Sequence, residues 1–374
     1  MDLNGLHLGR IALVHDWIDS LGGAESTFLE MALALPQADL YALTMAPSFK
    51  RTFADRTVRT TWLDRNFLRS NRALTLPLMS PAWRSLRTGR RYDLIVTSVH
   101  ALAREFALGR SDAHLCYTYT PLRYVWTPQI DGRGSARLLK PARAALKRLD
   151  RRTVASVDSF ASISNEVAAR VSEFYGRASV VIPPPVDTGF FNEGANPRGQ
   201  RGDYLLSVGR FVPYKRHDLV IEAGALLGAK VVIAGSGPDE RRLRELAARL
   251  PNSQVDFHVA PTREKVRDLM RGARLFVFPS FEDFGIVPVE AQACGTPVVA
   301  FGRGGSLDTV IPGRTGLLVG TQSASEFASG IASCDGLQLS KDDCRQNAER
   351  FSQSEFRGRF LAWTQEYSPA SRST

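Results

Sequence analysis

The sequence predicts an α/β fold made of two Rossmann-like domains. Short apolar runs alternate with helical patterns along the chain, and this alternation starts afresh after a proline-rich connector at residues 181–187. The length of 374 residues is also sufficient for two domains of ordinary size. Alternating strands and helices are typical of parallel sheets, because parallel neighbours need long crossover connections.

The first half opens with a strand, a glycine pair and a helix. The apolar run at 11–16 precedes Gly22 and Gly23, and the amphipathic stretch 24–33 follows and stops near Pro36. A basic helical pattern fills residues 138–158. Further short apolar runs predict strands at 39–44, 94–98, 113–117 and 159–162.

The second half repeats this order after the connector. The run Pro183 to Pro185 excludes a helix or a central strand, and a polar loop follows at 192–203. Strands are then predicted at 204–209, 231–234, 255–259, 275–278 and 297–301. Helices are predicted at 217–227, 239–250, 263–272, 287–294 and 324–333. We therefore expect a first domain at 1–185 and a second at 186–354, facing each other across a cleft.

The composition excludes several classes of protein. Hydrophobic residues make up 44% and charged residues 23%, which excludes a disordered, collagen-like or disulfide-scaffold chain. The four cysteines lie too far apart for a Cys-x-x-Cys metal site, and a reducing cytosol is their natural setting. No apolar run approaches the roughly 20 residues that span a bilayer, and the first residues lack the layout of a signal peptide. We expect a cytoplasmic protein.

The positive charge is concentrated in the first half. Residues 1–150 hold 21 basic and 13 acidic side chains, whereas residues 201–374 hold 22 and 20. This asymmetry predicts an anionic partner for the first domain, which could be a phosphorylated substrate or an acidic membrane surface. Nucleic acid is a weaker alternative, because no binding module for it is recognisable. The basic residues that recur over 137–152 either form a solvated helix face or lie on an anionic membrane.

The most informative segment is the loop and helix start at 279–300. Ligands bind at the carboxyl ends of strands in open α/β sheets, and Gly285 directly before a helix leaves amides and a dipole that favour a phosphate. Glu282 lies in the loop and Glu290 about one turn into the helix, so these carboxylates could hold hydroxyls of a sugar or a ribose. The alternative is that Glu282 caps the helix and Glu290 is a solvated surface charge.

A second strand-end loop, at 207–217, carries Arg210 and Lys215. Arginine binds phosphate through a planar fork and lysine as a compact charge, so the pair suits a diphosphate, although such a pair is more often simply solvated. Two loops with phosphate chemistry in one domain favour a shared site. No Asp-x-Asp pair is present to hold a metal–diphosphate complex, so we expect a site without metal or cofactor.

Three further segments give weaker evidence about ligand binding. Gly22 and Gly23 before a helix would let backbone amides approach a phosphate or a sugar closely. His100 ends another strand of the first domain, where a lone histidine is more often structural than functional. The turn at 234–238 lacks the third glycine of a dinucleotide fingerprint and is interpreted as a tight turn.

In this order, the segments resemble family 4 of the retaining glycosyltransferases, which have the GT-B fold. The resemblance rests on Gly-Arg…Lys at 209–215, Gly-Ser-Gly at 235–237 and Glu…Phe-Gly…Glu-Ala…Gly-Thr-Pro at 282–297, and it extends over nearly the whole chain. It implies a helix within 355–374 that crosses back to the first domain before a tail. It also implies transfer of a sugar with retained α stereochemistry, by a front-side displacement in which the leaving phosphate helps to deprotonate the acceptor.

The resemblance assigns a role to each candidate residue. Arg210 and Lys215 would hold the donor diphosphate, Glu282 would hold the transferred sugar, and His100 would approach that sugar from the other domain; these are the expected catalytic residues. The other donor contacts would come from the glycine pair, the helix start, the ribose-binding carboxylate and a residue beside the base: Gly22, Gly23, Gly285, Ile286, Val287, Glu290 and Val259.

Two further segments narrow the resemblance. Residues 15–17 with the nearby glycine pair, and residues 117–126, are similar to bacterial mannosyltransferases of O-antigen and exopolysaccharide assembly, although this chain reads Leu-Gly-Gly-Ala-Glu where Arg-Gly-Gly-Glu-Lys is commoner. A packed aromatic loop is the alternative for 117–126. The subgroup implies GDP-mannose as donor, a lipid-diphosphate-linked saccharide as acceptor and a peripheral position on the inner face of the cytoplasmic membrane. The alternatives are a UDP-sugar-dependent glycosyltransferase and a GT-B-like sugar-nucleotide isomerase.

Overall fold

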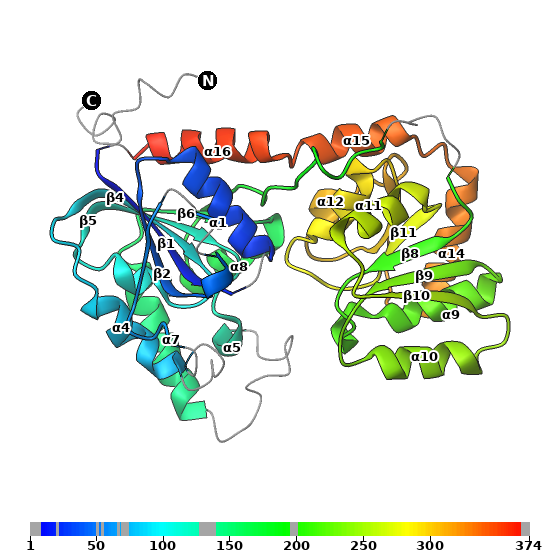
Figure 1. Ribbon diagram of the computed structural model, residues 1–374, viewed down its shortest axis with the longest axis horizontal. Helices are drawn as coiled ribbons and strands as arrows, with labels where there is room; N and C mark the ends of the chain where they lie inside the picture. The colour runs from blue at the N-terminus through cyan, green and yellow to red at the C-terminus, as the bar shows by residue number, and fades with distance from the viewer. Residues whose placement is uncertain are drawn as a thin grey trace. The chain divides into compact units, whose positions relative to one another are not determined.

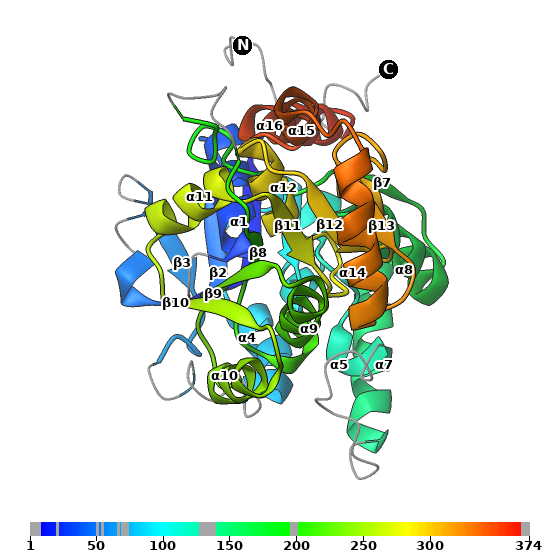
Figure 2. The ribbon, with the colours of Figure 1, turned by 90° about the vertical axis from the view of Figure 1, so that its right-hand side faces the viewer.

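The computed structural model divides the chain into two compact units. The first comprises residues 1–185 and 356–374, and the second comprises residues 186–355. The structure describes residues 9–19, 22–49, 52–53, 56–65, 68, 75–126, 140–194 and 201–367. Each unit holds one parallel sheet between layers of helices (Figure 1 and Figure 2). The predicted α/β fold with two Rossmann-like domains is therefore confirmed.

Parallel strands form the sheet of the first unit. They are β1 (Ile11–Ile18), β2 (Asp39–Met45), β3 (Val58–Thr60), β4 (Tyr92–Val99), β5 (Ser111–Thr118), β6 (Ser159–Ser162) and β7 (Ser179–Val181). Their order across the sheet is β3-β2-β1-β4-β5-β6-β7. Residues at the centres of the strands, such as Leu13 in β1 and Val96 in β4, are fully buried, which explains why these strands appear as continuous apolar runs in the sequence.

Helices cover both faces of this sheet. They are α1 (Gly23–Ala34), η2 (Pro47–Phe49), η3 (Leu76–Leu78), α4 (Met79–Ser85), η4 (Ala103–Phe106), α5 (Arg123–Trp126), α7 (Lys140–Val154), α8 (Asn165–Tyr175) and α16 (Gln353–Gln365). One face carries α1 and α16, and the other carries α4, η4 and α7 (Figure 1). In α16, the Phe356 ring packs against Tyr117 and the Trp363 indole donates to Ser159 Oγ over 3.0 Å.

The second unit has the same layered arrangement. Its strands are β8 (Leu205–Val208), β9 (Lys230–Gly235), β10 (Gln254–Val259), β11 (Leu275–Phe278), β12 (Val298–Phe301) and β13 (Gly316–Val319). Their order is β10-β9-β8-β11-β12-β13. The helices are η6 (Pro213–Lys215), α9 (His217–Leu227), α10 (Glu240–Arg249), α11 (Arg263–Gly272), α12 (Ile286–Ala293), α13 (Ser306–Thr309), α14 (Ala324–Ser333), η7 (Cys334–Gly336) and α15 (Lys341–Glu349). The helices α9, α10 and α14 lie on one face, with α11 and α12 on the other (Figure 1).

The structure differs from the sequence-based elements in a few places. Three strands, β3, β7 and β13, were not predicted. β3 and β7 have only three residues each, and β13 is a four-residue strand that begins at Gly316. The basic helix ends at Val154 rather than at residue 158, and residues 137–139 lie outside the described ranges. The connector at 182–185 is extended and follows β7 directly.

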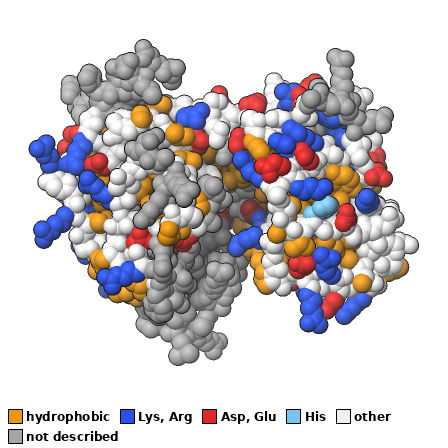
Figure 3. All heavy atoms as spheres, in the orientation of Figure 1, with side chains coloured by type: hydrophobic (Ala, Val, Ile, Leu, Met, Phe, Trp, Pro, Cys, Tyr) orange, Lys and Arg blue, Asp and Glu red, His pale blue; other side chains and the backbone are white. Residues whose placement is uncertain are grey.

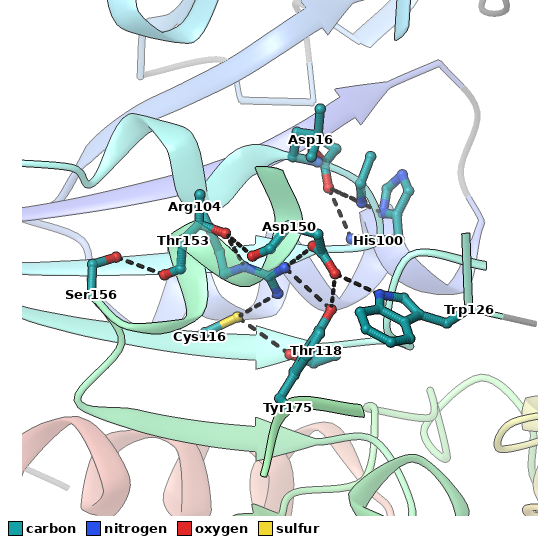
Figure 4. A network of polar contacts seen from close by, with 12 residues as sticks. Asp16, His100, Arg104, Cys116, Thr118, Trp126, Asp150, Thr153, Ser156 and Tyr175 are labelled. Carbon is teal, nitrogen blue, oxygen red and sulfur yellow. Dashed lines mark hydrogen bonds and ion pairs between the residues drawn. The ribbon is translucent and has the colours of Figure 1, made fainter. Parts of the chain in front are cut away.

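A buried ion pair fixes the layer beneath β4 and β5. Arg104 in η4 pairs with Asp150 in α7, and neither side chain is more than 2% exposed. The Arg104 Nε donates to Thr153 Oγ1 over 3.0 Å, and Asp150 Oδ2 accepts from Trp126 Nε1 over 2.7 Å and from the Tyr175 hydroxyl over 2.8 Å (Figure 4). Arg104 and Asp150 each have several polar partners, and these interactions offset the free-energy cost of removing the two charges from water. The pair ties η4, α5, α7 and α8 together.

Replacing Asp150 by alanine should destabilise the protein by about 3–5 kcal/mol, because Arg104 is then buried without a carboxylate. Arg91→Ala is the matched control, because its pair with Asp112 is exposed and such pairs contribute about 0–1 kcal/mol. Urea unfolding of both variants measures the difference. Equal midpoints for the two variants would contradict a structural role for the buried pair.

Candidate functional site

The strand order reverses once in each sheet, and the predicted site residues lie at both points. β1 lies between β2 and β4, and β8 lies between β9 and β11. The carboxyl ends of β1 and β4, and of β8 and β11, therefore mark the switch points at which open α/β sheets bind ligands. The residues that follow these strands are Gly22, Gly23, His100, Arg210, Lys215, Glu282 and Gly285.

A close backbone contact fixes the loop that follows β8. The Phe211 amide donates to the Ser236 carbonyl over 2.8 Å. Gly237 has a φ of +154°, and a Cβ on it would lie 2.4 Å from the Phe211 carbonyl oxygen, so only glycine fits. The Gly-Ser-Gly segment is thus a tight turn that supports the loop carrying Arg210.

An ion pair between Lys215 and Glu282 joins the loops after β8 and β11. The two side chains are only 11% and 23% exposed, and Ser280 Oγ donates to the same carboxylate oxygen of Glu282 over 3.3 Å. Arg210 is exposed, and its guanidinium donates to the Tyr214 hydroxyl over 3.2 Å. The structure therefore brings Lys215 and Glu282 together, while Arg210 contacts Tyr214. Glu282 does not cap α12, so that alternative is wrong.

Glycine contacts shape the start of α12. Gly285 has a left-handed backbone with φ +84°. The Gly305 amide, in the loop after β12, donates to the Glu282 carbonyl over 2.9 Å, and a Cβ on Gly305 would lie 2.1 Å from a carbonyl oxygen of the β11 loop. Because glycine is the N-cap, it supplies no side-chain acceptor to α12. The helix start at Ile286 and Val287 thus has the form in which helix amides bind anions.

Glu290, further along α12, lies in a desolvated and charged setting. It is half-buried. Burial raises the pKa of Glu290 to about 7; the positive charge of Arg263 opposes this shift, and the negative charge of Asp187 adds to it. Arg263 itself pairs with Asp187 over 2.8 Å. Glu290 therefore titrates near neutral pH, and its interpretation as a solvated surface charge is wrong.

Val259 lies at the same edge of the second sheet. It is the last residue of β10, pairs with Gly235 of the tight turn and is 43% exposed. The following residue, Ala260, has a φ of +46°, and its amide donates to the Gly235 carbonyl over 2.7 Å. The chain is therefore fixed where it leaves the strand, and Val259 presents an apolar surface next to the turn.

His217 supports the site, although the sequence did not single it out. It is buried, with Nδ1 3.0 Å from Ser207 Oγ and Nε2 3.3 Å from the Arg210 carbonyl oxygen. Burial, aided by the positive charge of Lys215, lowers the pKa of His217 to about 4. The ring is thus neutral at pH 7, so that Nε2–H donates to the Arg210 carbonyl and Nδ1 accepts from Ser207. The feature of the sequence that could have indicated this supporting role is the position of His217 two residues after Lys215.

The glycine pair of the first unit begins α1. The Gly22 amide donates to Glu25 Oε2 over 3.2 Å, and a Cβ on Gly22 would lie 2.7 Å from that oxygen. The Gly22 amide, which was expected from the sequence to contact a phosphate or a sugar, therefore donates to Glu25 instead. Gly23 is exposed at the first position of the helix.

Asp16 fixes the loop that carries His100. The buried Asp16 carboxylate accepts from the amides of His100, Ala101 and Leu102 over 2.8, 2.7 and 2.9 Å (Figure 4). His100 Nδ1 lies 3.9 Å from Asp16 Oδ2. The sequence did not assign this role to Asp16, because its partners lie more than 80 positions away along the chain. The backbone of the loop that carries His100 is therefore held by a buried carboxylate.

The aromatic segment 117–126 is packed in the first unit. The Tyr117 hydroxyl donates to the Ile182 carbonyl over 2.9 Å, and the Tyr119 hydroxyl donates to the Ala24 carbonyl over 2.9 Å. Trp126 bonds Asp150, as described above. These contacts agree with the interpretation of this segment as a packed aromatic loop.

The basic residues of α7 divide into two groups. Lys147 Nζ and the Arg151 guanidinium lie 4.5 and 5.0 Å from the centre of the Trp126 ring, so both contribute to packing. Arg148 and Arg152 are exposed. Arg137, which the sequence placed in the same cluster, lies outside the described residues.

Neither a metal-ligating cluster nor a membrane-spanning helix is found in the described residues. Among the residues that the structure describes, no three His, Cys, Asp or Glu side chains are grouped so as to hold a metal ion. Within the same ranges, no helix is both long and apolar enough to cross a membrane.

On the face of the second unit drawn in Figure 3, basic and acidic side chains lie interspersed.

Two family descriptions match consecutive parts of the chain. Glycosyltransferase Family 4 matches residues 21–190, and glycosyl transferases group 1 matches residues 191–351. HepE of Anabaena, solved in complex with UDP and glucose, has the same fold, with a TM-score of 0.70 and 19% identity over 95% of this chain and 99% of that chain. Sucrose-phosphate synthase from Thermosynechococcus elongatus gives a TM-score of 0.72 and 20% identity over 96% and 98%. The two matches together cover residues 21–351, and the chain has the GT-B fold.

Curated relatives share about half of the chain. A D-inositol 3-phosphate glycosyltransferase of Mycobacteroides abscessus is 36% identical over 219 residues, which cover 54% of this chain and 47% of the relative. The enzyme of the same name from Geodermatophilus obscurus is 33% identical over 230 residues, covering 54% and 51%. The chain thus spans about half the length of the curated relatives it matches. These relatives support the glycosyltransferase prediction but not its narrower assignment to O-antigen mannosyltransferases.

The contribution of Glu290 to the stability of the unliganded protein should fall as the pH rises from about 5 to 7.5, whereas buried neutral histidines such as His217 contribute the opposite slope below about pH 6.5. The reason is that the pKa of Glu290 is raised on folding, so that the folded state binds more protons than the unfolded chain in this range. The contribution should be about 1–3 kcal/mol, at roughly 1.4 kcal/mol for each pKa unit. It is measured as the difference in unfolding free energy between the wild type and Glu290→Gln across the range. Glu245→Gln, an exposed control on α10, should retain the wild-type slope, and the same slope in Glu290→Gln would contradict the assignment.

Proposed function

We propose that this protein transfers a hexose from a nucleoside diphosphate donor to a saccharide acceptor, with retention of the α configuration. The observation that carries the proposal is the ion pair between Lys215 and Glu282 at the switch point of the second sheet. The start of α12, which lacks a side-chain cap, follows in the same loop. A cation, a carboxylate and helix amides are the groups that a diphosphate and a sugar require.

In this proposal, the second unit binds the donor. Lys215, Arg210 and the amides of Ile286 and Val287 bind the diphosphate. The Glu282 carboxylate, released from Lys215 by the incoming phosphate, accepts hydrogen bonds from hydroxyls of the sugar. The ribose and the base are bound by two residues at the same edge, Glu290 and Val259.

The chemistry is a displacement at the anomeric carbon of the donor sugar. The bond from this carbon to the phosphate oxygen breaks, and the electron pair leaves with the nucleoside diphosphate. The acceptor oxygen forms the new bond on the same face, and its proton goes to the leaving phosphate. Lys215 and Arg210 stabilise the charge that develops on this phosphate, which is electrostatic catalysis without a metal. His100, held by Asp16, binds a hydroxyl of the transferred sugar.

Two classes of nucleotide sugar are candidates for the donor. The resemblance of residues 15–17 and 117–126 favours GDP-mannose, whereas HepE, with the same fold, has been solved with UDP and glucose. The acceptor proposed from the resemblance is a lipid-diphosphate-linked saccharide, for which the exposed Arg148 and Arg152 of α7 would supply a basic membrane-facing surface.

Single alanine substitutions of Arg210, Lys215 and Glu290 should each lower kcat/KM by about 100-fold or more, because each removes a donor contact. The measurement is the rate of nucleoside diphosphate release from GDP-mannose, UDP-glucose and UDP-N-acetylglucosamine with a lipid-diphosphate-linked saccharide acceptor, together with identification of the products. The rate should not change on addition of EDTA. Arg241→Ala, an exposed control on α10, should be fully active.

Full activity in all three variants would exclude the proposed donor site. Conversion of a nucleotide sugar to an isomer in the absence of an acceptor would instead identify a sugar-nucleotide isomerase.

Charge reversal on α7 tests the membrane contact. Arg148→Glu combined with Arg152→Glu should lower co-sedimentation with vesicles of equal phosphatidylcholine and phosphatidylglycerol by about tenfold or more, at roughly 1 kcal/mol for each basic residue near the surface. Arg241→Glu combined with Arg249→Glu reverses two exposed arginines on α10 and should have little effect. Unchanged binding of the α7 variant would count against the contact.

A further inference from the structure

A row of mostly aromatic residues crosses the carboxyl edge of the first sheet. The strand register aligns one residue from each of five strands in a first row: Thr60, Ala42, His15, Ser98 and Tyr117. Two positions further along the chain from each of these residues come Trp62, Thr44, Trp17, His100 and Tyr119. Trp17 and Thr44 are still paired in β1 and β2, whereas the other three follow the ends of β3, β4 and β5. These five residues stand at the edge where parallel sheets bind ligands, and we call them the aromatic row.

Ring contacts connect the row across β1, β4 and β5. The Trp17 and His100 rings meet edge to face with centroids 4.2 Å apart, and those of His100 and Tyr119 are 5.9 Å apart. Tyr119 is held by its hydroxyl, which bonds Ser98 Oγ over 3.0 Å. The backbone of the loop that carries His100 is held by Asp16, so this part of the row is fixed before any ligand arrives.

Trp62 extends the row at the other end of the sheet, on an ordered turn after β3. The Thr61 amide donates to the Leu43 carbonyl over 3.2 Å, and the Met45 amide donates to Asp64 Oδ1 over 3.2 Å, so the turn is fixed to β2 on both sides of Trp62.

The exposed side chain of Trp62 lies between buried neighbours. Thr61 and Leu63 are buried, whereas Trp62 is 45% exposed. Among the aromatic side chains named here, exposure rises from Tyr119 at 9% through the half-buried Trp17 to Trp62, whereas Thr44 between the two tryptophans is only 6% exposed. A tryptophan held rigidly at the surface offers a ligand a large apolar face at little cost in conformational entropy.

We propose that the aromatic row binds the acceptor as a saccharide of at least two sugar rings, and this inference rests on the proposed function. One face of a pyranose ring presents C–H groups that pack on an aromatic ring, while the hydroxyls remain free for polar neighbours. β1 and β3 are two strand spacings apart, about 10 Å, so a single ring cannot contact both Trp17 and Trp62.

The polar side chain of His100 favours a saccharide over a lipid chain or an apolar peptide. Thr44 lies between the two tryptophans in the strand order, and His100 lies beside Trp17. Thr44 is only 6% exposed, so His100 is the polar member of the row that a ligand can reach, and an imidazole beside an indole offers a sugar ring both a polar and an apolar contact. The ring at His100 would be the one that receives the transferred sugar, and the ring at Trp62 would be further along the acceptor.

The test compares ligands of one, two and three rings on the full chain. The probes are methyl α-mannoside with α-linked mannobiose and mannotriose, methyl α-glucoside with maltose and maltotriose, and inositol 3-phosphate. In at least one series, the two- and three-ring ligands should quench tryptophan fluorescence saturably in the wild type and much less in Trp62→Phe. By calorimetry, Trp62→Ala should weaken their binding about fivefold to tenfold, whereas Trp62→Phe should stay within about twofold and the single-ring ligand should be unaffected.

Leu33→Ala is the control, because Leu33 is an equally exposed apolar residue of the first unit. Thermal stabilisation by UDP and GDP, measured on the same samples, reports the donor site separately. UDP or GDP could stabilise the protein while Trp62→Ala has no effect on binding, or while no two- or three-ring probe binds. Either result would overturn the aromatic row as the acceptor site and leave the proposed function intact. Absence of stabilisation by either nucleotide would count against the proposed function itself.

Discussion

The ion pair between Lys215 and Glu282 is the interaction on which the candidate site depends. It joins the loops that follow β8 and β11, the two strands between which the order of the second sheet reverses. Both side chains are largely buried, so neither charge is well solvated without the other. A diphosphate offers Lys215 a more highly charged acceptor than one carboxylate does, and the release of Glu282 then provides an acceptor for sugar hydroxyls. In the proposed function, the same pair joins the two loops before the donor binds and divides into two binding groups when the donor arrives.

Around this pair, backbone contacts allow little freedom. Gly237 lies against the Phe211 carbonyl, and Gly305 lies against the β11 loop, at distances that exclude a Cβ. The neutral His217 ring donates from Nε2 to the Arg210 carbonyl oxygen and so fixes the backbone at Arg210. In the first unit, Asp16 has the equivalent role, because three amides of the His100 loop converge on it. In the proposed function, groups held in this way would stabilise developing charge without reorganising during the reaction.

The sequence predicted those features that depend on local pattern. Buried parallel strands are continuous apolar runs, so ten strands could be located, whereas β3 and β7, of three residues each, are too short to form such runs, and the four-residue β13 was missed although other strands of that length were found. The tight turn at 235–237 and the helix start at Gly285 follow from glycine placement. The pairing of Lys215 with Glu282 and the convergence of the 100–102 amides on Asp16 could not be predicted, because these partners are 67 and more than 80 positions apart. The capping of Gly22 by Glu25 was local, but the glycine pair was interpreted as a ligand contact instead.

The binding of UDP and GDP to the wild type and to Glu282→Gln tests the central role of the ion pair most directly. In the variant, Lys215 no longer has a competing carboxylate, so calorimetry should give dissociation constants for both nucleotides about fivefold or more below the wild-type values, a gain of about 1 kcal/mol. The sugar-bearing donors should gain less, because Glu282 no longer accepts from their hydroxyls. Unchanged or weaker binding of UDP and GDP by Glu282→Gln would contradict the competition between Glu282 and the diphosphate for Lys215.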